Sequence, residues 1–184
     1  MIKMKKVIYL LTLIVTISII SCGEPESENK IDKVPIVNTK GLEELDLSEY
    51  GYNLSIMVPR ADMNGVADVK LSERGTLEIV IGLDYGLEIM FGDGDLELLK
   101  TDLRDGLVFD SEILKEDKNT LVYTQFIPDS GVKIQNHFMH VFKAGDNVYE
   151  IRDIVAREYG SGMIEKMLQS ARTIKVLNLD NVPV

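Results

Sequence analysis

The sequence predicts an α+β domain, built from a mainly antiparallel sheet of about seven strands with two helices packed against it. Three observations favour this fold class: segments in which apolar and polar residues alternate, short polar turns between them, and two stretches with helical spacing of apolar residues. The chain has 184 residues, 45% hydrophobic and 27% charged, a composition typical of globular proteins. Its single cysteine excludes an intramolecular disulfide, so we expect folding to depend on a hydrophobic core.

The expected strands are recognised by their period of two. In "YGYNLSIMVP", Tyr52, Leu54 and Ile56 share one face. Pro59 closes this strand, because proline cannot donate to a ladder. The expected strands span residues 50–59, 66–71, 76–83, 85–91, 107–115, 120–127, 133–143 and 148–155. Because short turns join neighbouring segments, most strand pairs are expected to be antiparallel.

Two other segments have the spacing of an amphipathic helix. The first lies within residues 92–106, where leucines recur three and four residues apart, acidic residues stand at the start and Gly106 follows the end. The second covers residues 161–174 and carries an apolar stripe, with Ser161 as its expected N-cap. Each helix therefore has one apolar face, which we expect to pack on the sheet.

The N-terminus has the form of a secretory signal. Three lysines lie within "MIKMKK", and the following stretch from Val7 to Ile20 contains no charge. At about 1.5 Å per residue, a helix of this stretch would span roughly 21 Å, which is short of the ~30 Å hydrocarbon thickness of a bilayer. We therefore expect a cleaved signal rather than a permanent membrane-spanning helix.

The junction that follows, Ile19-Ile20-Ser21-Cys22, resembles the lipobox of bacterial lipoproteins: an aliphatic residue at position −3, a small residue at −1, and then cysteine. The resemblance implies that diacylglycerol is attached to the Cys22 thiol, that the signal is cut before Cys22, and that the new amino terminus is acylated. Two or three acyl chains hold a protein firmly, since each buried methylene contributes about 0.8 kcal/mol. A buried core thiol or a catalytic cysteine is the weaker interpretation, because no base stands near it. Cys22 is thus the expected lipidation site.

These features divide the chain into four expected parts. Residues 1–21 form a lipoprotein signal peptide, residues 22–46 the lipidated N-terminus and a flexible tether, residues 47–178 a single α+β domain, and residues 179–184 a short tail. The tether is expected because residues 23–41 are rich in Glu, Asn, Lys and Pro and poor in aromatic residues. As a flexible coil, this stretch would reach about 24 Å.

Charge and lipidation together predict the location and the class of partner. The formal net charge is −10, and about −13 after cleavage, because the signal carries lysines and no acid. Such a chain is repelled by nucleic acid and by anionic membrane surfaces, so we expect no nucleic-acid partner. The membrane is instead reached through the lipid, and an envelope protein is the expected partner. Gly23 stands where aspartate favours inner-membrane retention, so the outer membrane is favoured if the organism has one.

The strand pattern predicts that the two histidines do not form a metal site. His137 and His140 lie in "QNHFMH" within an expected strand, where a spacing of three puts them on opposite faces. His140 shares its face with Phe138 and Phe142, so we expect a core residue. His137 shares its face with Lys143 and is expected to be solvated. No zinc is expected.

The acidic residues also lack a catalytic or metal-binding pattern. Asp93 and Asp95 start a helix, where the helix dipole explains them better than a calcium loop does. Glu150 and Asp153 fall on opposite faces of a strand, which does not suit an acid and base pair. Serines at turns have no G-x-S-x-G context, and no phosphate-binding loop is found. We expect no catalytic, cofactor-binding or metal-binding residue and no cofactor.

The order of elements in residues 50–175 resembles that of the MOG1/PsbP-like α/β sandwiches. The opening "GYNLSIMVP" and the closing "NVYEIRDI" and "MIEKMLQSARTI" carry this resemblance, although tryptophan, frequent in such closing regions, is missing. The resemblance implies a binding or assembly role rather than an enzyme. We therefore expect a membrane-anchored lipoprotein that acts as a non-catalytic binding or assembly module of the cell envelope. Two alternatives stay open: a carboxylate- or metal-dependent envelope enzyme, and a lipoprotein that neutralises a basic toxin or cationic peptide.

Overall fold

The fold is given by a computed structural model, which describes residues 38–177. The expected signal peptide, the expected lipidation site Cys22, most of the expected tether and the expected tail lie outside the described residues. The predictions made for those segments therefore stay predictions. Within the described residues, no helix is long and apolar enough to cross a membrane.

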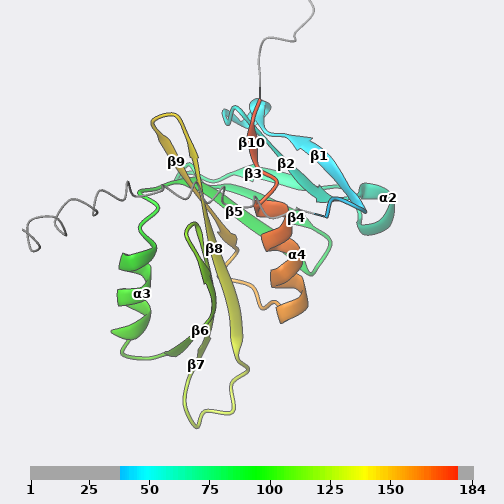
Figure 1. The fold of residues 1–184 in the computed structure, drawn as a ribbon. Helices are drawn as coiled ribbons and strands as arrows, with labels where there is room; N and C mark the ends of the chain where they lie inside the picture. Colours follow the sequence, from blue (N-terminus) through cyan, green and yellow to red (C-terminus); the bar gives the residue numbers. More distant parts are fainter. Residues whose placement is uncertain (1–37, 178–184) are drawn as a thin grey trace, which may run out of the picture. The chain divides into compact units, whose positions relative to one another are not determined.

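The α+β class predicted from the sequence is confirmed, because antiparallel strands dominate and two longer helices pack against them (Figure 1). The strands are β1 (Leu42–Asp46), β2 (Leu54–Pro59), β3 (Asp68–Leu71), β4 (Leu77–Ile81), β5 (Tyr85–Phe91), β6 (Asp110–Asp117), β7 (Thr120–Phe126), β8 (Gln135–Ala144), β9 (Asn147–Asp153) and β10 (Lys175–Val176). The helices are η1 (Ser48–Tyr50), α2 (Ala61–Asn64), α3 (Leu96–Arg104) and α4 (Ser161–Ala171).

The strands form two sheets, and each neighbouring pair is antiparallel. The larger sheet has seven strands in the order β3-β4-β5-β9-β8-β7-β6, which matches the predicted number and direction. A second sheet of three strands, β1-β2-β10, was not expected from the sequence. The first predicted strand, β2, therefore lies at the centre of the smaller sheet rather than in the larger one.

The boundary predicted between the tether and the domain at residues 46 and 47 is wrong, because β1 lies within the segment assigned to the tether. β1 pairs with β2 in a regular register that sets Leu45 opposite Ile56. Its sequence, "LEELD", does not predict a strand, because only Leu42 and Leu45 are half-buried and the other three side chains are exposed. An edge strand of this kind lacks the alternation that marks a strand in a sequence.

The larger hydrophobic core lies where inward-facing side chains of β2 meet those of β4, β5 and β9. Leu54 and Ile56 of β2, Ile79 of β4 and Ile89 of β5 are each at most 1% exposed. Helix α4 closes this core, since it contacts β2, β5, β8 and β9 through buried residues such as Met167. Each such side chain contributes about 1.5–3 kcal/mol to folding.

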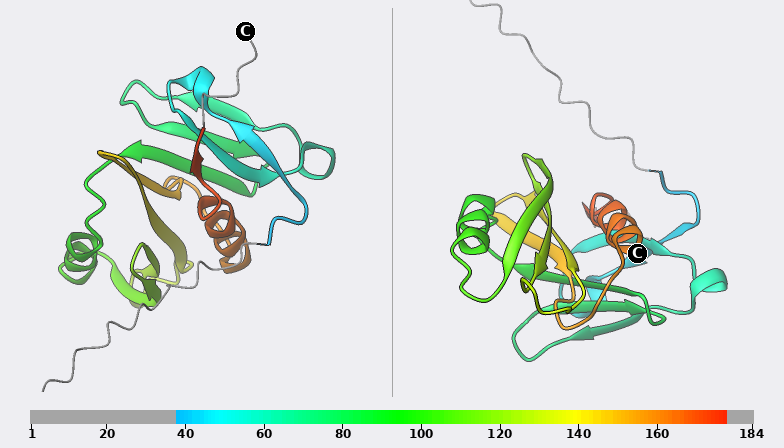
Figure 2. Two further views of the ribbon diagram at one scale, coloured as in Figure 1. Left: turned by 45° about the horizontal axis from the view of Figure 1, so that its top comes forward. Right: turned by 90° about the horizontal axis from the view of Figure 1, so that it is seen from below.

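Helix α3 packs on β7, on the face of the larger sheet opposite to the one that α4 covers. Figure 2 shows β7 and β8 between α3 and α4. Leu103 of α3 packs with Leu121 and Tyr123 of β7 in a smaller cluster, whereas Val122 and Phe138 face the larger core. Both faces of this part of the sheet are therefore covered. This arrangement decides where the two histidines lie.

Candidate functional site

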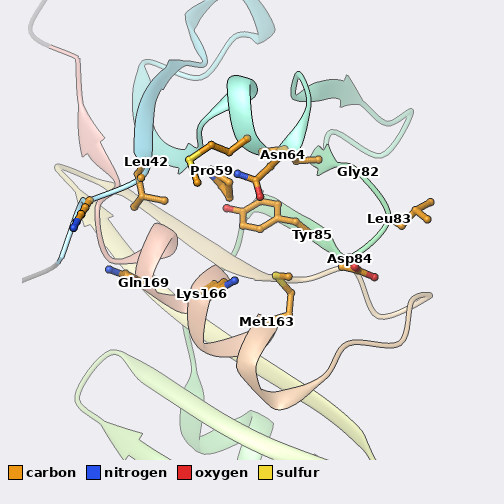
Figure 3. A pocket seen from close by; sticks show the side chains of 14 residues that line it. Leu42, Pro59, Asn64, Gly82, Leu83, Asp84, Tyr85, Met163, Lys166 and Gln169 are labelled. Atoms are coloured by element: carbon orange, nitrogen blue, oxygen red, sulfur yellow. The ribbon is translucent and has the colours of Figure 1, made fainter.

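A groove of about 360 Å³ opens beside the start of β1, and we call it the N-terminal groove. Four segments that are far apart in the sequence line it: the start of β1, the end of β2 together with α2, the turn between β4 and β5, and α4. Its walls are formed chiefly by Leu42, Met63, Leu83, Tyr85, Met163 and Lys166. Figure 3 shows Tyr85 in the middle of the groove, between α4 and the segment that carries Pro59 and Asn64.

Local hydrogen bonds hold the wall formed by β1, β2 and α2. The Arg60 N–H donates to the Gly41 carbonyl at 3.2 Å, which joins the ends of β1 and β2. The Ala61 N–H donates to Glu43 Oε1 at 2.9 Å, so a carboxylate of β1 satisfies an N–H at the start of α2. These contacts fix the short helix at the groove edge and set Met63 on its rim.

The turn between β4 and β5 forms the next wall. Gly82 has a φ of 61°, a left-handed conformation that favours glycine. A Cβ atom at Gly82 would lie 3.4 Å from the Asn64 carbonyl oxygen, so the turn closely approaches the end of α2. Ile81 and Tyr85, on either side of the turn, are 3% exposed and form the buried floor.

Two large apolar side chains stand exposed at the rim of this groove. Met63 is 72% exposed and Leu83 is 91% exposed, whereas the floor beneath them is buried. Single exposed apolar residues are common, but here both flank the same concave surface. Apolar side chains around a concavity are typical of ligand sites, and methionine adapts its shape to a partner. The groove is therefore a candidate binding surface.

Polar groups lie at opposite ends of the groove. Lys166 and Gln169 of α4 stand toward one end in Figure 3, and Asp84 stands at the other. Lys166 makes no ion pair within residues 38–177, whereas its neighbour Glu165 pairs with Lys115 at 2.8 Å. Asp84 is the one carboxylate among the lining residues. The groove thus has a cationic end and an acidic end with an apolar floor between them.

Two hydroxyl groups are buried in this region without satisfied hydrogen bonds. The Tyr85 Oη and Ser170 Oγ atoms have no hydrogen-bond partner among the described residues. Burial raises the pKa of the Tyr85 phenol, and the nearby Ser170 hydroxyl offsets part of that rise. The phenol is therefore neutral at pH 7 and cannot serve as a base.

The second arrangement of interest is a buried pair formed by His137 and Asp153. The His137 Nδ1 and Asp153 Oδ2 atoms are 2.7 Å apart, and the two side chains are 2% and 1% exposed. The other carboxylate oxygen, Oδ1, accepts from the Phe138 N–H at 2.9 Å. Because a carboxylate only accepts, we assign the proton to His137 Nδ1. With no exposed edge the pair cannot meet a substrate, so its role is structural.

The prediction of a solvated His137 is wrong. Its side chain packs against Tyr123, with ring centroids 5.4 Å apart, on the face that α3 helps to cover. Strand alternation assigns His137 to the face opposite Phe138, but it cannot show that both faces of β8 are buried. Asp153 stands just beyond the last paired residues of β8 and β9, where its side chain replaces a main-chain partner.

His140 is half-buried, as a residue on the core face should be, and it also borders a second hollow. Burial and, to a smaller extent, the positive charge of Arg172 lower the pKa of His140 to about 4, so the ring is neutral at pH 7. Its Nδ1 atom lies 3.0 Å from the Thr120 hydroxyl. The hollow is lined by this ring, by Val141 and Phe142, and by the exposed Lys118 and Lys143, and it has no exposed apolar side chain comparable to Met63 or Leu83.

The other acidic residues singled out in the sequence accept hydrogen bonds from backbone N–H groups. Asp95 caps α3 by accepting from the Leu98 N–H at 2.9 Å, and Asp93 accepts from the Asp95 N–H at 3.1 Å. Glu150 accepts from the Gly94 N–H at 3.1 Å, which fastens the loop before α3. Glu150 and Asp153 thus belong to separate hydrogen-bond networks.

The serines considered from the sequence also have local roles. Ser130 bridges a turn, donating to the Ile127 carbonyl at 2.7 Å. Ser161 is the first residue of α4 rather than its N-cap, which is Gly160. Across residues 38–177, no three His, Cys, Asp or Glu side chains gather as metal ligands would.

Sequence reasoning missed the N-terminal groove altogether. Its lining comes from four separate segments, so no spacing in the sequence marks it. The available signals were weak: Leu83 is an apolar residue within a polar turn, and Met63 stands alone between polar residues. Comparison with protein-family models, curated proteins and solved structures finds no match to the chain. The function assigned to the groove therefore depends on its own geometry.

Proposed function

We propose that the protein is a lipid-anchored module of the bacterial cell envelope that binds a ligand in the N-terminal groove without catalysing a reaction. The observation that supports this most is the exposure of Met63 and Leu83 above the buried floor made by Ile81 and Tyr85. Covering such apolar surface is favourable, at about 25 cal/mol per Å² removed from water. A ligand that fills the groove would cover both side chains.

The segment that leads from the proposed anchor into the domain lines the groove. Lys40 and Leu42 line the groove, and the lipobox cysteine precedes them by 18 and 20 residues. A flexible tether of residues 23–41 would reach about 24 Å. The groove would then lie close to the bilayer to which the lipid is attached.

The enzyme alternative has less support in this groove. General acid and base chemistry needs two titratable groups within hydrogen-bond reach of a substrate, and Asp84 is the single carboxylate that lines it. Burial raises the pKa of Glu88, but Glu88 pairs with Arg152 at 3.2 Å and does not line the groove. The toxin-neutralising alternative needs an acidic surface, whereas Lys40 and Lys166 are among the residues that line this groove.

The anchor is tested by metabolic labelling of bacteria with a palmitate analogue. The wild-type chain should be labelled and should fractionate with membranes. Cys22→Ala should abolish the label and leave the precursor uncleaved, because the modified thiol is the proposed attachment point. An unlabelled wild-type chain, or a labelled Cys22→Ala variant, would refute the anchor.

The binding surface is tested separately by photo-crosslinking in intact cells. A photo-reactive amino acid placed at Leu83 should give a defined adduct in the intact mass of the protein, whether the adduct is a protein or a small molecule. The matched control is the same amino acid at Leu107, which is 100% exposed and does not line the groove. Equal adducts at both positions, or none at Leu83, would contradict binding in the groove.

A further inference from the structure

The size of the N-terminal groove limits what it can bind. Its volume of about 360 Å³ is near the lower end of the ~300–1,000 Å³ range of small-molecule sites. The groove therefore fits a small molecule with a compact apolar body.

The apolar part of that molecule has a defined path. Met163 of α4 and Tyr85 of the floor lie between the two ends of the groove in Figure 3, and Leu83 lies toward the acidic end. An apolar chain laid along this path would cover Met163, the aromatic floor and the exposed Leu83. Its polar head would then lie at the other end.

The polar head of the ligand has to match the residues at the end of the groove opposite Asp84. Met163, Lys166 and Gln169 follow one another at intervals of three along α4, so they share one side of the helix. Lys166 and Lys40 are both lining residues, and neither forms an ion pair within residues 38–177. In a chain of net charge −10, Lys166 at this end of the groove and Lys40 among its lining residues favour an anionic head.

We propose that the N-terminal groove binds a small amphiphile with one carboxylate head, oriented with the carboxylate at Lys166 and the apolar chain running toward Leu83. Asp84 at the far end reinforces this orientation, because it repels an anion there. This inference rests on the proposed function, since it names the class of ligand for the same groove. It assigns Lys166 as the residue that recognises the head.

The test uses methionine methyl groups as reporters in the full chain, reconstituted in lipid nanodiscs. Isotope-labelled methionine places probes in the groove at Met63 and Met163, and a buried control at Met139 of β8. Met63→Leu and Met163→Leu identify the two groove signals. Octanoate should shift both groove signals saturably and leave Met139 unchanged. Octylamine, which has the same chain and the opposite charge, should give no saturable shift over the same concentrations.

Substitutions separate recognition of the head from general apolar binding. Lys166→Gln should weaken octanoate binding roughly five-fold, because a partly solvated charge pair has modest strength. The matched control Lys118→Gln, remote from the groove, should leave the affinity unchanged. Equal binding of octanoate and octylamine, or an unchanged affinity in Lys166→Gln, would overturn the proposal.

The same experiment distinguishes failure of the ligand class from failure of the proposed function. If octanoate shifts neither Met63 nor Met163 while crosslinking from Leu83 yields a protein-sized adduct, the carboxylate amphiphile is excluded and the binding function stands. A crosslinked adduct of a few hundred daltons at Leu83 together with saturable methyl shifts supports both. Absence of any adduct and of any shift refutes both.

Discussion

Removal of the Asp153 carboxylate is expected to destabilise the domain strongly, although the residue lies outside the N-terminal groove. Asp153→Ala leaves the His137 Nδ1–H and the Phe138 N–H without the acceptors that now lie at 2.7 and 2.9 Å. Each buried donor left unsatisfied costs about 1–3 kcal/mol, and breaking a buried pair typically costs about 3–5 kcal/mol. We therefore expect a loss of about 4 kcal/mol in the free energy of unfolding.

Urea denaturation followed by circular dichroism measures this loss. With a slope of about 2 kcal/mol per molar urea, the midpoint should fall by roughly 2 M. Asp153→Asn keeps an acceptor for the Phe138 N–H and should lose only about 1–2 kcal/mol, so it remains informative if the alanine variant does not fold. The matched control Asp102→Ala, on the exposed side of α3, should stay within about 0.5 kcal/mol. A loss below about 1 kcal/mol in Asp153→Ala would refute the buried pair.

Three further measurements test other parts of the structure. Gly94→Ala should lower the free energy of unfolding by about 2–5 kcal/mol in urea denaturation, because φ is 68° and the new Cβ would lie 2.6 Å from Val141 Cγ1. The matched control Gly145→Ala, with a φ of 60° and no atom near the new Cβ, should lower it by only about 1–2 kcal/mol. Equal losses in the two variants would contradict the close contact at Gly94. The His140 ring should titrate near pH 4 in an NMR titration, and a midpoint near 6.5 would contradict its burial. Its pKa in the folded state lies below the unfolded value of about 6.5, so the unfolded chain binds the proton first as the pH falls. Between about pH 6.5 and pH 4 the free energy of unfolding should therefore fall by up to ~3 kcal/mol. Leu83→Ser should change stability by less than about 0.5 kcal/mol, because the side chain is 91% exposed, while it abolishes octanoate binding; a large loss of stability would show that Leu83 supports the fold.

The sequence predicted most of the larger sheet, because its strands are half-buried and alternate clearly. Leu77, Ile79 and Ile81 of β4 face the core as the alternation indicated. Edge strands were placed less well: β6 begins at Asp110, and Leu107, included in the predicted strand, is fully exposed before it. An edge strand buries little surface, so its sequence carries little of the pattern on which prediction depends.

The sites were predicted less well than the fold, for a physical reason. The face of β8 on which His137 lies followed from the period of two, but its burial depends on tertiary packing: the ring lies against Tyr123, a residue that also packs in a cluster with Leu103 of α3. Its partner Asp153 occupies a buried position in the alternation of β9, where a carboxylate is not expected from the pattern, and its Oδ1 atom accepts from the Phe138 N–H. The N-terminal groove depends in the same way on tertiary packing, which brings Met63 and Leu83 to one rim.

The most direct test of the account is whether the N-terminal groove is occupied in the cell. Radical footprinting of living bacteria and of the purified chain compares two exposed leucines, Leu83 in the groove and Leu107 outside it. Occupancy predicts that Leu83 and Met63 are modified more slowly in cells than in the purified chain, while Leu107 is modified equally in both. Equal modification of Leu83 in both preparations would contradict the central claim that this groove is the binding surface.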